Sequence, residues 1–212
     1  MKAVIFDLDG TLLDVRAGLL WQFQQLVRQY DNEEITAEAI AAMAHGTTEQ
    51  LVRALVKNTE VPFDEICKRH AELRLESYDR FLKLYQGVDE LLPTLKRMGL
   101  DVAALTAGNK MTVDCLERLG IHHHFDVVID ASHVTRTKPD PEGLQLILQK
   151  LGHEPRDVVM VGDTVADITV GQRAGVGKTV GVSHGFGLTE ALQAAGADHI
   201  INDIPSLLDV IE

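Results

Sequence analysis

The segment KAVIFDLDGT, residues 2–11, joins a hydrophobic run to two carboxylates that stand two positions apart, Asp7 and Asp9. Like charges repel and a buried carboxylate is costly, so the pair needs a compensating charge if it ends a buried strand. A surface turn, which often carries Asp and Gly, is the alternative interpretation. The pair of carboxylates alone is compatible with both a buried strand end and a surface turn.

Further short hydrophobic runs, separated by turns and amphipathic segments, occur at 101–106, 126–130, 157–163, 178–182 and 198–201. Hydrophobic strands that alternate with helical segments are typical of a parallel sheet covered on both faces. Ligands bind such sheets at the carboxyl ends of the strands. The sequence therefore predicts an α/β fold, a Rossmann-like parallel sheet with helices on both faces, in which Asp7 and Asp163 meet.

The interval between the first two strands is too long for one crossover helix, and its periodicity is helical. The pattern predicts helices at 17–30, 37–44, 48–57, 64–84 and 88–98, of which the last returns the chain to the sheet. We therefore predict two domains. Residues 1–14 and 84–212 form the α/β core, and residues 15–83 form an inserted all-α module.

The composition excludes several classes of partner. A formal net charge of -12 without a basic block argues against nucleic acid. No apolar run reaches about 18 residues and acids interrupt the N-terminal hydrophobic segment, so we expect no membrane partner and no signal peptide. Cys67 and Cys115 lack the spacing of a zinc site or a disulfide framework. We expect a cytoplasmic monomer or homodimer.

A second acidic pattern, GDTVAD at residues 162–167, directly follows a predicted strand. Taken alone, Asp163 is explained as the cap of the next helix. Because it ends a strand of the same sheet as Asp7, however, several carboxylates converge, and this is tolerable only around a cation. Oxygen-only ligands with open positions select Mg²⁺, which shares phosphate oxygens with its substrates.

Two more residues complete the pattern. Thr106 ends a strand and precedes Ala-Gly-Asn-Lys, whose backbone N–H groups could hold an anion at a helix start. Lys138 stands just before a helix start set by Pro141. Taken singly, Thr106 is more simply explained as a helix cap and Lys138 as a solvated lysine. Together with the carboxylates, the two residues supply what phosphoryl transfer needs: a nucleophile, a metal, a hydroxyl donor and a fixed cation.

These four patterns, in this order and at strand ends, resemble the motifs of the haloacid dehalogenase-like hydrolase superfamily. The resemblance covers essentially the whole chain, and the helical insert lies where that family has its α-helical cap. The C-terminal pattern VGVSHGFG at 180–187, followed by AGADHIINDIPSL, is similar to the phosphoglycolate phosphatase branch.

The resemblance implies roles for the candidate residues. Asp7 is the nucleophile, which forms an aspartyl-phosphate, and Asp9 is the general acid and base. The implied cofactor is Mg²⁺, held by Asp7, the backbone carbonyl of Asp9, Asp163 and Asp167. The implied phosphate-binding residues are Thr106, Ala107, Gly108 and Lys138.

The chain departs from the family pattern at several positions. Family members often have Asn at the position of Ala107, so Gly108 or Asn109 is expected to supply one contact. The phosphoglucomutase branch has Thr and His where this chain has Val15 and Leu19, which counts against mutase activity. Dehalogenases and phosphonatases of the family usually have another residue at the position of Asp9, so Asp9 counts against both activities.

The insert carries the candidates for substrate choice. His45, Gly46 and Thr47 lie in a segment that resembles the family's loop into the active site, and Arg53 follows on the next predicted helix. A simple break between two helices, with Gly46 as C-cap and Thr47 or Thr48 as N-cap, is the plainer alternative.

The expected activity is Mg²⁺-dependent hydrolysis of a small phosphorylated metabolite of the phosphoglycolate or sugar phosphate type. A phosphomutase or phosphotransferase of the same superfamily and a pyrophosphate hydrolase are the alternatives. A receiver-like binding module also gathers acids around Mg²⁺, but Asp9 beside Thr11 and the large insert disfavour it.

Overall fold

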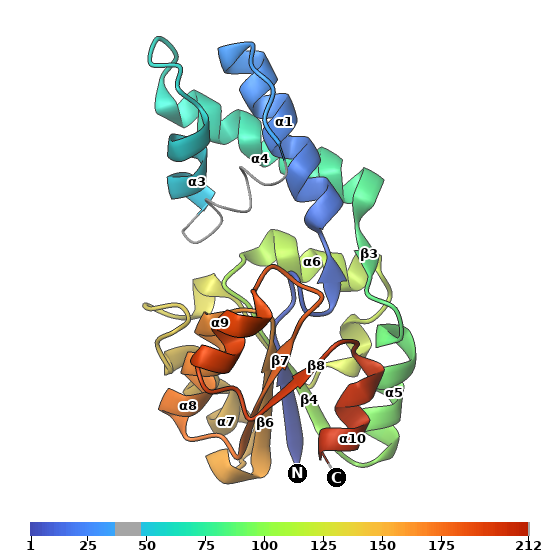
Figure 1. Cartoon of the computed structure of the whole chain (residues 1–212). Helices are drawn as coiled ribbons and strands as arrows, with labels where there is room; N and C mark the ends of the chain where they lie inside the picture. Colours follow the sequence, from blue (N-terminus) through green and yellow to red (C-terminus); the bar gives the residue numbers. More distant parts are fainter. Residues whose placement is uncertain (37–47, 212) are drawn as a thin grey trace. The chain divides into compact units, whose positions relative to one another are not determined.

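In the computed structural model, the N-terminal hydrophobic run forms strand β1 (Ala3–Phe6), all of which is buried. It lies between β4 (Asp101–Leu105) and β6 (Val158–Gly162), and both pairings are parallel. The sheet has six strands in the order β5-β4-β1-β6-β7-β8 (Figure 1). The remaining strands are β5 (Val127–Ile129) and β8 (His199–Ile201) at the two edges and β7 (Lys178–Val182) between β6 and β8. Each strand falls in a predicted run.

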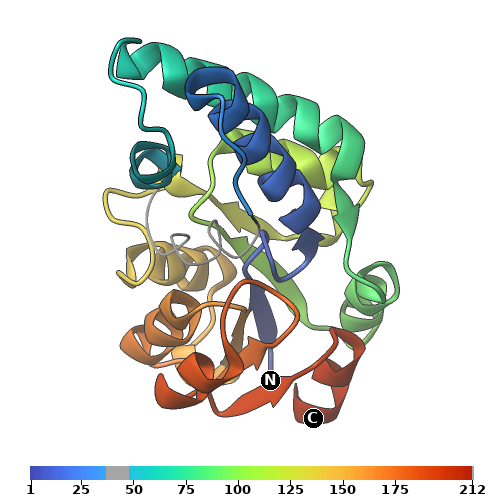
Figure 2. The same ribbon diagram turned by 45° about the horizontal axis from the view of Figure 1, so that its top comes forward.

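Helices cover both faces of this sheet, because successive residues of a buried strand point to opposite sides and both sides are apolar. Ala3 and Ile5 belong to the core cluster formed with α7 (Glu142–Leu151) and α8 (Val165–Ala174). Figures 1 and 2 show α5 (Val88–Arg97) and α10 (Leu208–Ile211) on the opposite side. The other helices of this part are α6 (Lys110–Arg118) and α9 (Thr189–Ala194), with 3-10 turns at 122–124, 131–133, 155–157 and 205–207. The predicted α/β fold is confirmed.

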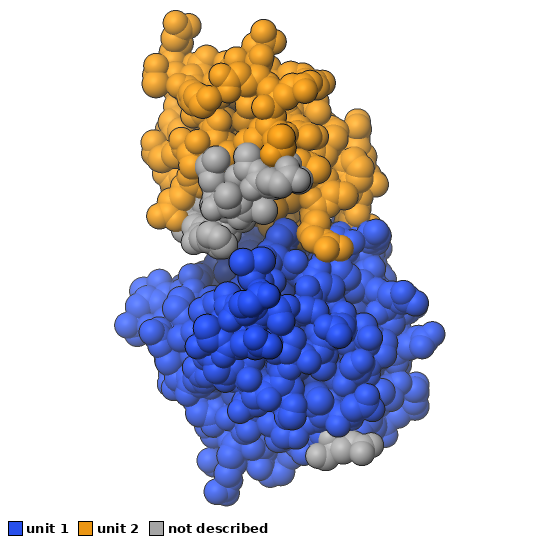
Figure 3. All heavy atoms as spheres, viewed as in Figure 1, with its two compact units in different colours: residues 1–14, 83–212 blue, residues 15–82 orange. Residues whose placement is uncertain are grey.

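The structure describes residues 1–36 and 48–211, and the chain divides into two compact units, residues 1–14 with 83–212 and residues 15–82 (Figure 3). The second unit is helical, with α1 (Arg16–Asp31), α3 (Thr48–Leu55) and α4 (Phe63–Phe81). The helix predicted at 37–44 lies outside the described residues. That the first unit is catalytic and the second a cap stays a prediction. In the described ranges, no helix has both the length and the apolar character needed to cross a membrane.

A short antiparallel ladder between β2 (Leu13–Asp14) and β3 (Lys83–Leu84) corrects the sequence interpretation. The predicted helix that ran to Leu84 was wrong at its end, since α4 stops at Phe81 and the next residue is extended. The interval between the first two predicted strands therefore does contain strands. A two-residue pairing between distant segments has no local periodicity, so the sequence pattern gives no sign of it.

The second unit has its own apolar core between α1, α3 and α4, and His70 is buried among its described residues. The ring of His70 stacks on Phe23 with 4.8 Å between centroids. Only 5% of the His70 surface is exposed. Burial lowers the pKa of His70 to about 4, with a further contribution from the charge of Arg74.

We expect His70 to weaken this protein in acid. Between its ordinary pKa of 6.5 and its folded value of about 4, the unfolded chain binds a proton that the folded chain excludes, so the free energy of unfolding falls as the pH falls. From pH 7 to 4.5 the loss at this residue is roughly 2 to 3 kcal/mol. Urea denaturation at the two pH values should show that His70→Leu reduces the loss by this amount.

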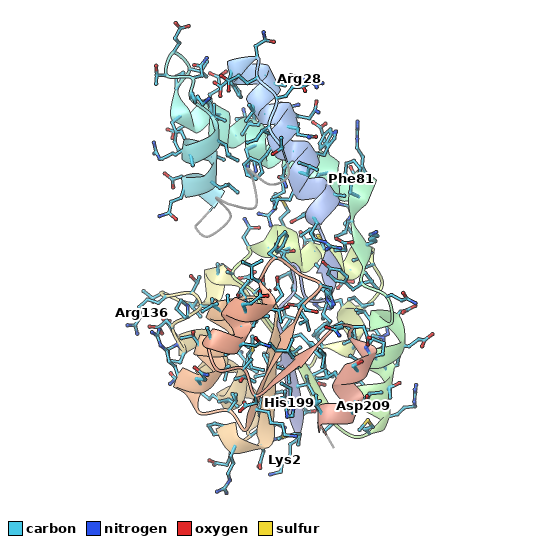
Figure 4. All side chains as sticks on the ribbon, in the orientation of Figure 1. Lys2, Arg28, Phe81, Arg136, His199 and Asp209 are labelled. Atoms are coloured by element: carbon cyan, nitrogen blue, oxygen red, sulfur yellow. The ribbon has the colours of Figure 1, made fainter. Side chains whose placement is uncertain are left out.

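The matched control is His199→Leu at an exposed histidine that starts β8 (Figure 4). This variant should keep the pH dependence of the wild type. An unchanged pH dependence in His70→Leu would contradict the assignment of the acid sensitivity to His70.

Candidate active site

Strand register places the first acidic motif beside the others. Phe6 is opposite Ala104 of β4 and Val161 of β6, so Asp7 lies at the carboxyl ends of both neighbours. The backbone N–H of Asp7 continues the ladder and donates to the carbonyl of Val161 at 2.9 Å. Asp163 immediately follows β6. The predicted meeting of Asp7 and Asp163 is therefore a direct result of the parallel pairing.

Three carboxylates gather at this edge of the sheet. Asp7, Asp163 and Asp167 each offer one oxygen, and these oxygens lie within 4.8 Å of one another. Asp7 is 6% exposed, and the other two are fully buried. The ammonium of Lys138, also buried, lies 2.6 Å from Oδ1 of Asp7 and 2.6 Å from Oδ1 of Asp167.

One lysine does not balance three acids, and the pKa values reflect this. Burial raises the pKa of Asp163 to about 6, and the charge of Asp167 adds to the effect. Burial also raises the pKa of Asp7 well above its usual range, although Lys138 opposes the shift. For Lys138, burial favours the neutral form, but the two carboxylates outweigh it and hold its pKa above the ordinary value. Among the described residues of this cluster, three ionised carboxylates and one ammonium carry a net charge of minus two, which is the charge that one divalent cation would neutralise.

Hydrogen bonds fix both oxygens of Asp163. Oδ1 accepts from the Thr11 hydroxyl at 3.0 Å, and Oδ2 accepts from the backbone N–H of Phe186 at 2.7 Å. Asp163 is not the helix cap, because Thr164 occupies that position before α8. Asp167 accepts from the backbone N–H and hydroxyl of Thr164 at 2.9 and 2.6 Å, so it closes the capping box while its other oxygen binds Lys138.

Asp9 stands apart from this cluster. It is half-buried, and its Oδ2 accepts a long hydrogen bond of 3.5 Å from the hydroxyl of Thr112. Gly10 separates it from Thr11 with a φ of 91°, and a Cβ there would lie 2.5 Å from Oδ2 of Asp163. The turn therefore requires glycine. Asp7 lies in the carboxylate cluster and Asp9 lies beside Thr112, so the two acids have different surroundings.

The loop after β4 holds three of the four expected phosphate-binding residues, Thr106, Ala107 and Gly108. The hydroxyl of Thr106 accepts from the Gly108 N–H at 2.9 Å, and Ala107 is exposed. Asn109, rather than Thr106, caps α6, through a hydrogen bond of 3.1 Å from the Met111 N–H to its side chain. A contact with phosphate through the Asn109 side chain would compete with this cap. Because the Thr106 hydroxyl accepts in its hydrogen bond with Gly108, its own proton is available to another acceptor.

The proposed specificity residues are placed only in part. His45, Gly46 and Thr47 lie outside the described residues. Arg53 is on α3 in the second unit, where it forms an ion pair with Glu49 at 3.0 Å and its guanidinium lies 3.5 Å from the centroid of the Phe63 ring. These contacts give Arg53 a structural role, and its part in substrate choice stays a prediction.

Sequence reasoning assigned no role in this site to Thr11, Phe186 or His184. Thr11 belongs to the first motif, but the sequence does not show that its hydroxyl donates to Asp163. Phe186 acts through its backbone, which the identity of a side chain does not reveal. The flanking glycines of His-Gly-Phe-Gly were the available signal, since glycine often marks a close backbone approach.

The fold and the site define an α/β protein that gathers buried carboxylates and one lysine at the strand ends of a parallel sheet. Residues 4–182 match the family described as haloacid dehalogenase-like hydrolase. The chain belongs to this family, which confirms the resemblance and the prediction of a phosphatase-type hydrolase.

Similar proteins match the chain along its full length. A pyrophosphatase PpaX from Oceanobacillus iheyensis is 31% identical over 216 residues, which cover 100% of this chain and 97% of that protein. An N-acetylmuramic acid 6-phosphate phosphatase from Pseudomonas aeruginosa is 31% identical over 223 residues, which cover 100% and 95%. The crystal structure of a predicted phosphoglycolate phosphatase from Haemophilus somnus 129pt has a TM-score of 0.90 at 22% identity and covers 100% and 98%. This last likeness shows the shared fold.

Lys138 should be far more important for stability than a surface lysine. Lys138→Met leaves the buried carboxylates without their cation, so the free energy of unfolding should fall by about 3 kcal/mol or more. The control is Lys2→Met, which removes an exposed ion pair with Asp157 at the start of β1 (Figure 4) and should cost less than about 1 kcal/mol. Urea denaturation in the presence of a chelator measures both, and equal losses would contradict the charge balance described above.

Proposed function

We propose that the protein is a Mg²⁺-dependent phosphatase that hydrolyses a small phosphorylated metabolite through an aspartyl-phosphate on Asp7. The observation that supports this most directly is the buried cluster of three carboxylates and one lysine, whose charge is incomplete without a divalent cation. Family membership and the phosphate-releasing activities named for the two relatives add support.

The donor set fits magnesium. Every candidate ligand is an oxygen, and Mg²⁺ prefers carboxylate, carbonyl and water oxygens to nitrogen or sulfur. We assign Asp7, the backbone carbonyl of Asp9, Asp163 and Asp167 as the residues that would hold it. When bound, the ion supplies positive charge that lets an anionic nucleophile approach an anionic phosphate.

In the first chemical step, a carboxylate oxygen of Asp7 attacks phosphorus. The bond between phosphorus and the leaving oxygen breaks, and Asp9 gives that oxygen a proton. The Lys138 ammonium lies 2.6 Å from Oδ1 of Asp7, next to the attacking carboxylate. The same ammonium can also donate a hydrogen bond to a phosphoryl oxygen. The hydroxyl of Thr106 is a second donor for the phosphoryl group.

In the second step, water hydrolyses the aspartyl-phosphate. Asp9, now a carboxylate, takes a proton from the water as the water oxygen attacks phosphorus. Asp7 leaves as a carboxylate, and inorganic phosphate is released. The separation of Asp9 from the cluster of Asp7, Asp163 and Asp167 suits a group that must alternate between its two protonation states.

The Asp7 assignment makes a direct prediction. Asp7→Asn should lower the release of phosphate from an aryl phosphate by about a thousandfold or more, because an amide is not a nucleophile. In the wild type, borohydride added during turnover should reduce the acyl phosphate and convert Asp7 into homoserine, which mass spectrometry of the peptide detects. The control Asp157→Asn, before β6 at the opposite end of the strand from Asp163, should keep full activity. Substantial turnover by Asp7→Asn would contradict the mechanism.

Substrate choice has two candidates that the comparisons favour. The muramic acid phosphatase supports the expected sugar phosphate type, and the PpaX relative supports pyrophosphate. We expect phosphate release from phosphoglycolate or a sugar phosphate to exceed release from pyrophosphate when all are assayed with Mg²⁺. A higher kcat/KM for pyrophosphate would favour the second candidate. Formation of a phosphorylated isomer without free phosphate would identify a mutase.

A further inference from the structure

The segment Ser-His-Gly-Phe-Gly at residues 183–187 wraps closely around Asp163. The N–H of Phe186 donates to Oδ2 of Asp163 at 2.7 Å. A Cβ on Gly185 would lie 2.3 Å from the same oxygen, and a Cβ on Gly187 would lie 1.8 Å from the Asp163 backbone carbonyl. Real side chains do not approach this closely. The two glycines therefore let the backbone reach the carboxylate.

A different segment holds the other side of Asp163. The Thr11 hydroxyl donates to Oδ1 at 3.0 Å. Each carboxylate oxygen therefore receives one hydrogen bond, one from the turn after β1 and one from the loop after β7. The carboxylate keeps its orientation only while the two segments keep their positions relative to each other.

His184 and Tyr85 join these two segments. Nε2 of His184 lies 3.1 Å from the carbonyl of Thr11, and because a carbonyl only accepts, this nitrogen must carry a proton. The His184 ring packs on the ring of Tyr85 with 4.0 Å between centroids. The Tyr85 hydroxyl donates to the carbonyl of His184 at 3.2 Å, and its backbone N–H donates to the carbonyl of Leu12 at 3.0 Å. We call this set of contacts the Tyr85–His184 clasp.

We propose that His184 and Tyr85 are positioning residues, which hold Thr11 and Phe186 on Asp163 and thereby set how tightly the site binds Mg²⁺. The proposal rests on the proposed function. Groups that orient a metal ligand through hydrogen bonds commonly change metal affinity by about 10- to 100-fold when they are removed. The contacts of both residues lead to Asp163 through the segments that carry Thr11 and Phe186, so the effect should act on the cation rather than on the chemical step.

The test compares Mg²⁺ affinity across three variants of the full chain by isothermal titration calorimetry without substrate. His184→Phe keeps an aromatic ring against Tyr85 but removes the donor to Thr11, so the Kd for Mg²⁺ should rise about tenfold. Tyr85→Phe keeps the ring and removes the hydroxyl, and it should produce a smaller rise. His184→Gln restores a donor without the ring and should recover part of the affinity.

The matched control is Ser183→Ala, on the same loop. It removes a hydrogen bond of 2.9 Å between the Ser183 hydroxyl and Asn202, which does not involve Asp163, and it should leave the Kd unchanged. The kcat of His184→Phe at saturating Mg²⁺ should stay near the wild-type value. A lower melting temperature with an unchanged Kd in both His184→Phe and Tyr85→Phe would show that the clasp only stabilises the fold.

Failure of the proposed function would look different. A wild-type protein that shows neither Mg²⁺ binding in the titration nor Mg²⁺-dependent phosphate release would overturn both proposals. A wild type that binds Mg²⁺ and releases phosphate, with variants of unchanged Kd, would overturn only the clasp.

Discussion

The contact of Lys138 with Asp7 and Asp167 is the interaction on which the site depends. Three carboxylates cannot share a buried space unless positive charge reduces their repulsion, and the lysine supplies part of it at 2.6 Å from two of them. An imbalance of negative charge remains, and burial, with a further contribution from the neighbouring carboxylates, raises the pKa of Asp7 and Asp163. The same imbalance makes the site a suitable place for a divalent cation, whose charge would then let an anionic phosphate approach.

Backbone geometry supplies the second constraint. Asp163 is held by one hydroxyl and one backbone N–H, and glycines at positions 10, 185 and 187 make room for this arrangement. Such an arrangement fixes a carboxylate without adding another charged side chain to a site that is already crowded with acids. In the role proposed for it, the Tyr85–His184 clasp extends this support to the segments that carry the donors.

Several features could be predicted from the sequence because their signals are local. Short hydrophobic runs predicted all six strands of the sheet, and the parallel order of α/β folds then predicted that Asp7 and Asp163 meet. Local patterns failed where the structure depends on pairing between distant segments. The β2–β3 ladder was missed for this reason, and so was the contact of His184 with Thr11. Asp167 was expected as a supporting metal ligand, but its second partnership, with Thr164, was not foreseen.

The sequence by itself determined the α/β class, the family, and the residue types from which the site is built. These follow from hydrophobic periodicity and from motifs whose members lie within a few residues of one another. Only the tertiary structure decided which oxygen of each carboxylate has which partner, and that His184 joins the turn after β1 to the loop after β7. The reason is physical: a hydrogen bond depends on distance and direction between atoms, and residues far apart in the sequence acquire both only when the sheet has formed.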